Sequence, residues 1–154
     1  SYPYVFDLIV CKGRYINNKS KKLSRLSKFI DIKFSKILDR RIFRKKLFLG
    51  MTPPHQTTLF SKSAFEKLPI FSDDFLLASD LNYFLNFSKI EDISILVLND
   101  ELVNMSTGGI SAQKNKLRLK EVISSYKKSF GIFFPIPFIF RYLRKISLKF
   151  FRIL

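Results

Sequence analysis

Three short segments of the sequence hold residue types that could do chemistry: His55-Gln56, Ala78-Ser79-Asp80 and Gly108-Gly109-Ile110-Ser111. A histidine can orient a substrate or move a proton, and a carboxylate can act as a general base. A glycine pair allows the backbone to approach a ligand closely. Each segment also has an ordinary structural interpretation, as a hydrogen-bonding histidine, a helix-capping Asp and a tight turn. Taken singly, none of the three indicates a function.

The elements that would position these segments are those of an α/β chain with few strands for its length. In the first part of the chain, periodicity, caps and turn residues predict strands over 4–10 and 14–16 joined by a turn at 12–13, followed by a basic helix over about 21–46. An extended segment over 55–60 and short helices over 61–68 and 81–87 come next. The last part is predicted to hold strands over 94–98 and 102–105 and helices over 112–130 and 138–154. Ser61 or Ser63 is expected to cap the first short helix, and Ser79 or Asp80 the second.

The composition excludes several classes of protein. The chain has 154 residues, a length that suits one domain, and its 47% of hydrophobic residues is too high for a disordered chain. A single cysteine, Cys11, excludes a disulfide framework and a cysteine-based zinc site. No uninterrupted apolar run approaches the roughly 20 residues that span a bilayer.

The chain is strongly basic, with 28 Lys and Arg against 12 Asp and Glu and a net charge of +16. Half of the basic residues, 14 of 28, lie between 12 and 46. Such a charge attracts the phosphates of nucleic acid or of anionic lipid, although a Lys-, Ile-, Asn- and Phe-rich composition can also reflect the nucleotide content of a genome. The basic stretch is either the solvated face of a docked helix or a surface for a membrane or a phosphate.

The three chemical segments and their neighbours follow one another in a recognisable order. The run is Pro54-His55-Gln56, Leu59-Phe60, Phe65-Glu66-Lys67-Leu68, Ala78-Ser79-Asp80-Leu81, Thr107-Gly108-Gly109-Ile110-Ser111 and Lys120-Glu121. It resembles the C-terminal half of a family 2 glycosyltransferase of the GT-A fold, of the kind that builds bacterial polysaccharides and lipid-linked glycans. The resemblance covers about residues 48–128.

The resemblance implies an enzyme of hexosyltransferase type that moves a sugar, with inversion, from a nucleotide-sugar to a glycan or lipid-linked acceptor. Asp80 is then the catalytic base, which a helix N-terminus would keep ionised. His55, Gln56 and Ser79 are expected to bind substrate. The loop residues Gly108, Gly109 and Ser111 are expected to do so as well.

The sequence departs from this family in its first third. Family members hold a divalent metal, Mg or Mn, on the donor diphosphate with an Asp-x-Asp-type motif, and no such motif precedes His55. Asp7 stands alone, and Asp73-Asp74 come too late in the order. We therefore expect residues 1–131 to form a partial GT-A, Rossmann-like domain that lacks its N-terminal nucleotide-binding half. Such a fragment would be inactive alone or would need a separately encoded partner half.

The last segment, 132–154, is predicted to be a basic amphipathic helix. From Ile139 its apolar residues recur at intervals of four and three, with five cations between Arg141 and Arg152. Residues 138–154 would then lie in the interface of an anionic membrane, or would pack on the domain or on a partner. A cytoplasmic protein, peripheral at the inner face of the cytoplasmic membrane, is the expected location.

Two other functions stay open at this level. The charge, with 18 Phe and 6 Tyr for base stacking, permits a nucleic-acid-binding module. The sequence shows no recognition motif for that role, and we expect no nucleic-acid partner. A folded but non-catalytic remnant of an enzyme would have the same sequence features.

Overall fold

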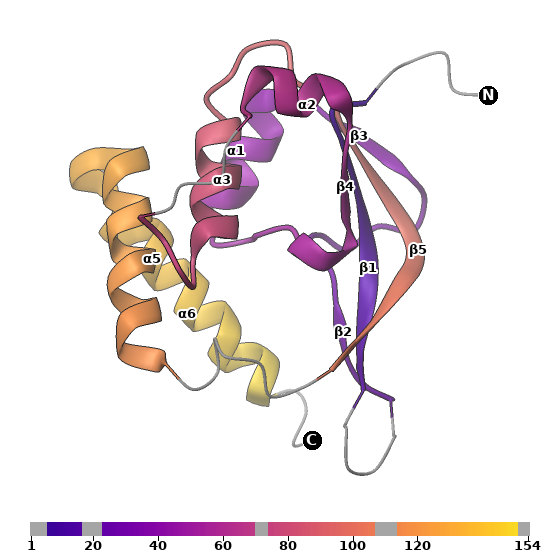
Figure 1. Ribbon diagram of the computed structural model, residues 1–154. Coiled ribbons are helices and arrows are strands. Elements are labelled where there is room, and N and C mark those ends of the chain that lie inside the picture. Colours follow the sequence, from indigo (N-terminus) through magenta and orange to yellow (C-terminus); the bar gives the residue numbers. More distant parts are fainter. Residues whose placement is uncertain (1–5, 17–22, 70–73, 107–113, 151–154) are drawn as a thin grey trace.

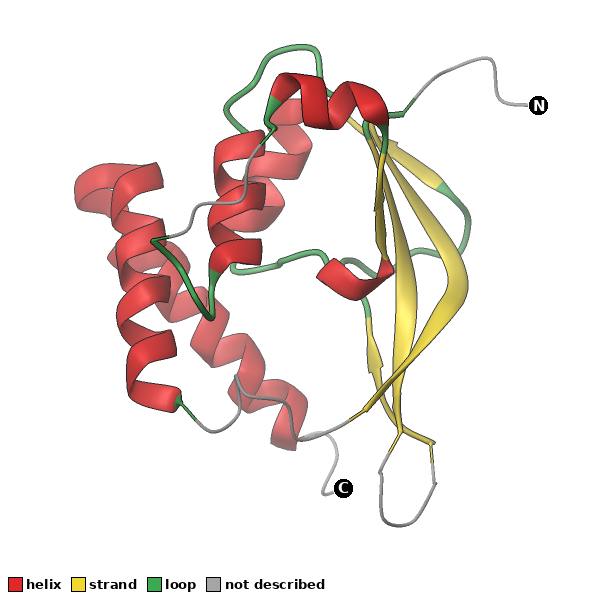
Figure 2. Ribbon diagram, viewed as in Figure 1, coloured by secondary structure: helices red, strands yellow, loops and turns green. Residues whose placement is uncertain are grey.

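The computed structural model describes residues 6–16, 23–69, 74–106 and 114–150. It has two layers, a curled mixed sheet and a group of helices gathered on one face of that sheet (Figures 1 and 2). The α/β class that the sequence predicts is confirmed at this level.

The sheet is built around its first strand, β1 (Leu8–Ile16). β1 pairs in parallel with β5 (Ile95–Ser106) along one edge. Along the other edge, β4 (Thr58–Phe60) pairs with the first half of β1 and β2 (Leu23–Ser27) with the second half, both antiparallel. The short β3 (Lys36–Leu38) pairs antiparallel with β5 at the outside of the sheet.

The helices in the described residues are α1 (Arg40–Phe48), α2 (Lys62–Lys67), α3 (Ser79–Phe87), α5 (Asn115–Phe130) and α6 (Pro135–Phe150), with 3₁₀ turns η1 (His55–Thr57) and η2 (Gly131–Phe133). α3 is the central helix of the layer. Its residues Leu81, Phe84 and Leu85 are fully buried, and it packs against α5. A helix that is apolar on nearly all sides must lie in the core, and α3 does so.

The predicted basic helix over 21–46 is wrong. The described part of this stretch forms β2 and β3, and a helix begins only at Arg40, where Asp39 caps it by accepting a hydrogen bond from the Ile42 N–H at 2.8 Å. The helical spacing of apolar residues was overridden by strand pairing, because β1 and β5 offer free edges on which these segments form ladders.

The predicted turn at Lys12-Gly13 is also wrong, because β1 runs through it without a break. Gly13 serves close packing instead. A Cβ at this position would lie 2.6 Å from Thr57 Cγ2 and 2.8 Å from Met105 Cε. Similarly, the two strands predicted over 94–98 and 102–105 are one continuous strand, β5.

The C-terminal helix exists but begins earlier than predicted, at Pro135. Phe138 and Tyr142 on one side of α6 pack against the hydrophobic core. Arg141 donates a hydrogen bond to Thr52 Oγ1. One face of the tail helix is therefore integrated with the rest of the fold.

Candidate functional site

Asp80 lies in the first turn of α3, as the sequence predicts. Its Oδ1 accepts a hydrogen bond from the Leu81 N–H at 2.7 Å, and Oδ2 has no hydrogen-bond partner within the described ranges. The side chain is half-buried, as is that of Ser79. Neither residue caps the helix, contrary to expectation, because the N-cap position is Ala78, which has no capping side chain. One carboxylate oxygen of Asp80 is thus left available at the positive end of the helix.

The loop that leads into α3 is held by a buried carboxylate, that of Glu121 on α5. Its Oε2 accepts hydrogen bonds from the N–H groups of Leu77 and Ala78 at 2.7 and 2.8 Å, and its Oε1 accepts one from Leu76 at 3.1 Å. Three successive backbone N–H groups around one carboxylate make a strong, charge-assisted cradle. This contact positions the turn that carries Asp80.

The sequence pointed to Glu121 only as part of a trailing Lys120-Glu121 pair. No local signal assigns it this role, because its partners lie more than 40 positions earlier in the chain.

His55 and Gln56 form the exposed start of η1. The His55 ring lies 5.8 Å from the ring of Phe60, which in turn lies 5.5 Å from Tyr83 and 6.1 Å from Phe84 on α3. The His55 segment and the Asp80 helix therefore share one aromatic cluster.

The backbone of η1 is held by two threonine hydroxyls. Thr57 Oγ1 donates to the Cys11 carbonyl on β1 at 2.8 Å, and Thr58 Oγ1 donates to the Pro54 carbonyl at 2.9 Å. These bonds tie the His55 turn to the central strand of the sheet.

The third predicted segment, with Gly108, Gly109 and Ser111, lies outside the described residues. β5 leads toward it and ends at Ser106, which pairs with Ile16 at the end of β1. The structure therefore links two of the three predicted segments, those of His55 and Asp80, through common packing.

Asp7, which looked isolated in the sequence, is a buried structural residue. Its carboxylate accepts hydrogen bonds from Lys67 Nζ at 2.9 Å, Ser63 Oγ at 2.8 Å and the Ser94 N–H at 2.8 Å. Burial by itself raises the pKa of Asp7, but the hydrogen bonds and the charge of Lys67 outweigh it, and the pKa lies below its ordinary value. Asp7 ties β1 to α2 and to the start of β5.

No group of three or more His, Cys, Asp or Glu side chains that could hold a metal ion occurs in the described part of the chain. The divalent metal that the resemblance implies therefore finds no ligand set among these residues.

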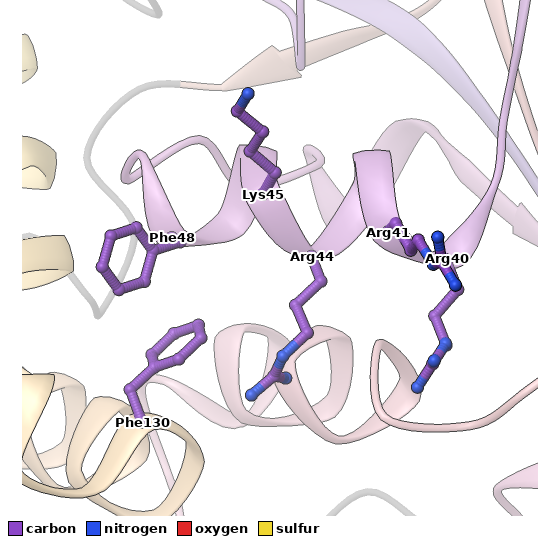
Figure 3. Close-up of a pocket in the computed structure, with 6 residues that line it drawn as sticks. All are labelled: Arg40, Arg41, Arg44, Lys45, Phe48 and Phe130. Carbon is purple, nitrogen blue, oxygen red and sulfur yellow. The ribbon is translucent and has the colours of Figure 1, made fainter.

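A second site, a cationic pocket, lies between α1 and the end of α5. This pocket of about 400 Å³ is lined by Arg40, Arg41, Arg44, Lys45, Phe48 and Phe130 (Figure 3). Arg44 is held by hydrogen bonds to Ser88 Oγ and the Ser129 carbonyl, both at 3.0 Å, and stacks over the Phe130 ring at 4.6 Å. Sequence reasoning missed the pocket because Phe130 lies far along the chain from α1.

Comparisons of the chain with protein-family models, with curated proteins and with solved structures found no match. Within the described ranges, no helix combines the length and the apolar character needed to cross a membrane.

Proposed function

We propose that this chain supplies the acceptor-side half of an inverting glycosyltransferase, with Asp80 as the general base. The observation that carries the proposal is the placement of Asp80. It lies in the first turn of a buried helix, with Oδ2 free of partners among the described residues and with the preceding loop held by Glu121. A general base must be rigidly positioned, and the bonds of Glu121 hold the loop that leads into the helix of Asp80.

In this proposal, Asp80 Oδ2 accepts the proton of an acceptor hydroxyl. The hydroxyl oxygen attacks the anomeric carbon of the sugar while the bond to the nucleotide diphosphate breaks on the opposite face, so that the configuration inverts. A positioned base contributes roughly 10²–10⁴-fold to such a reaction. The acceptor is a glycan or a lipid-linked glycan.

The other residues take supporting roles. His55 and Gln56, exposed on η1, and Ser79, beside the base, would orient the acceptor. The Gly108-Gly109 loop with Ser111 would bring backbone close to the substrate. The nucleotide-sugar and its Mg or Mn would bind to a donor half of GT-A fold, and the reaction would take place in the cytoplasm, at the inner face of the membrane.

The test is sugar transfer by the longer protein or complex that contains this chain and a donor-binding half. Asp80→Asn keeps the shape of the side chain but removes its basicity, so transfer should fall at least about 100-fold while donor binding is retained. Asp100→Asn, at an exposed position on β5, is the matched control and should retain transfer. Wild-type-like transfer by the Asp80 variant would remove this residue from the mechanism.

A further inference from the structure

An apolar stripe is exposed along η2 and α6. It consists of Ile132, Phe133, Ile136, Ile139, Phe140, Leu143 and Ile146. Ile132 and Phe133 are 85% and 60% exposed. At about 100° per residue, the α6 members fall within roughly one third of the helix circumference. Phe138 and Tyr142, which pack on the core, lie on the other side of the helix. α6 therefore has one apolar face that packs on the core and a second apolar face that is exposed to solvent in the described part of the chain.

The cationic pocket adjoins the start of this stripe. Phe130, which closes one end of the pocket, directly precedes the η2 turn with Ile132 and Phe133. Figure 3 shows Phe130 facing Phe48, and Arg40 and Arg44 extending from the same side of α1, while Lys45 points away from them. No acidic residue lines this pocket. Arg40 and Arg41 also line a neighbouring cavity with Asp39, Glu91 and Asp92, but among the described residues neither arginine forms an ion pair.

We propose that this surface docks on an anionic membrane. The apolar stripe enters the boundary between headgroups and acyl chains, as amphipathic helices do. Arg40 and Arg41 bind the phosphate of a lipid headgroup, because a guanidinium group offers paired donors that match phosphate oxygens.

The net charge of the chain favours an anionic membrane, rather than a second copy of the chain, as the partner of this surface. Two copies, each with a net charge of +16, would repel one another across such a face. A bilayer that contains anionic lipid offers the opposite charge to the arginines and an apolar interior to the stripe. A nucleic acid would match the arginines and leave the stripe uncovered.

The surface is separate from the proposed glycosyltransferase site. Arg44 binds Ser88, the C-cap of α3, whereas Asp80 lies in the first turn of the same helix. The cationic pocket and Asp80 are therefore at opposite ends of α3, and membrane binding is measurable whether or not the chain takes part in sugar transfer.

The experiment is co-sedimentation of the full chain with phosphatidylcholine vesicles, with and without phosphatidylglycerol. Wild-type protein should bind the anionic vesicles, and less so at high salt. The double variants Ile132→Ser/Phe133→Ser and Arg40→Ser/Arg41→Ser should each lower the partition coefficient by about tenfold or more. Inorganic phosphate at the same concentration as the lipid phosphate should not release the protein from the vesicles, since a free phosphate makes no contact with the apolar stripe.

Matched controls come from residues 33–36, the loop before β3 and the first residue of that strand, which lie at the sheet side of the molecule (Figure 1). Phe34 is 84% exposed, and Lys33 and Lys36 are exposed as well. Phe34→Ser and Lys33→Ser/Lys36→Ser should leave binding within about twofold of wild type, on the scale of weak surface effects. Thermal unfolding of every variant checks that the fold is intact.

Several results would overturn the proposal. The first is that the wild-type protein binds no vesicle. The second is that the test and control variants lose vesicle binding equally, since this would indicate a general attraction between charges. Equal binding to neutral and anionic vesicles would remove the role of the arginines. A concentration-dependent dimer in sedimentation velocity that Leu143→Ser dissociates would assign the stripe to a second copy.

Discussion

The carboxylate of Glu121 on α5 accepts a hydrogen bond from the backbone N–H of Ala78, the N-cap residue of α3, at 2.8 Å. The same carboxylate binds the two preceding N–H groups, so one side chain fixes the loop that enters the central helix. The carboxylate and Ala78 are buried, so the Ala78 N–H would be left without a partner if the carboxylate were lost.

Glu121→Gln should therefore lower the free energy of unfolding by about 1–3 kcal/mol, since a neutral amide accepts weaker bonds and presents an N–H to backbone donors. Urea denaturation of the full chain measures this change. Glu66→Gln is the control, because Glu66 forms an exposed pair with Lys62, and the loss of that pair should cost at most about 0.5 kcal/mol. Equal losses in the two variants would mean that the loop is not held by Glu121.

The buried Asp7 predicts a pH dependence of stability. Because its pKa is lowered in the folded state, the unfolded chain binds the proton more tightly. The stabilisation is therefore complete well above the ordinary carboxyl pKa of 3.8 and is lost as the pH falls through the lower folded value.

Asp7→Asn should be less stable than wild type at pH 7, by about 1–3 kcal/mol for the lost charged hydrogen bonds. This difference should shrink as the pH falls from about 5 through the acid transition, since wild-type Asp7 then becomes protonated. Urea denaturation of both proteins across this range is the measurement. Asp74→Asn, at an exposed position paired with Lys128, should show little difference at any pH. A difference between Asp7→Asn and wild type that is constant with pH would contradict the assignment.

Two glycines have a positive φ, and substituting each of them by alanine distinguishes the cost of backbone strain from the cost of steric overlap. Gly50 has a φ of 74°, and a Cβ there would overlap the backbone of Arg141 on α6. Gly131 has a φ of 57°, and a Cβ there would meet nothing within 4 Å. Gly131→Ala should cost only the strain of an unfavourable backbone conformation, about 1–3 kcal/mol.

Gly50→Ala should cost the same strain and, in addition, a displacement of α6, so its loss should exceed that of Gly131→Ala by at least about 1 kcal/mol. Thermal and urea unfolding of the two variants provide the comparison. A Gly50 variant as stable as the Gly131 variant would show that the turn after α1 is not in this close contact with α6.

Several elements were determined by local sequence. Ser61 caps α2 by accepting from the Ala64 N–H at 3.1 Å, and α2 ends at Lys67, two residues before Pro69. Asp80 lies in the first turn of α3, directly before the apolar residues that predict this helix. These features need only neighbours a few residues away, so the sequence by itself predicts them.

Tertiary structure decided the rest. The segment 23–38 has helical spacing, but its residues 23–27 and 36–38 pair as strands with β1 and β5, because edge hydrogen bonds and burial of Leu38 outweigh a weak local preference. The cradle of Glu121 and the cationic pocket at Phe130 join residues more than 40 positions apart. No sequence pattern encodes such contacts, since they exist only after helices and sheet have packed together.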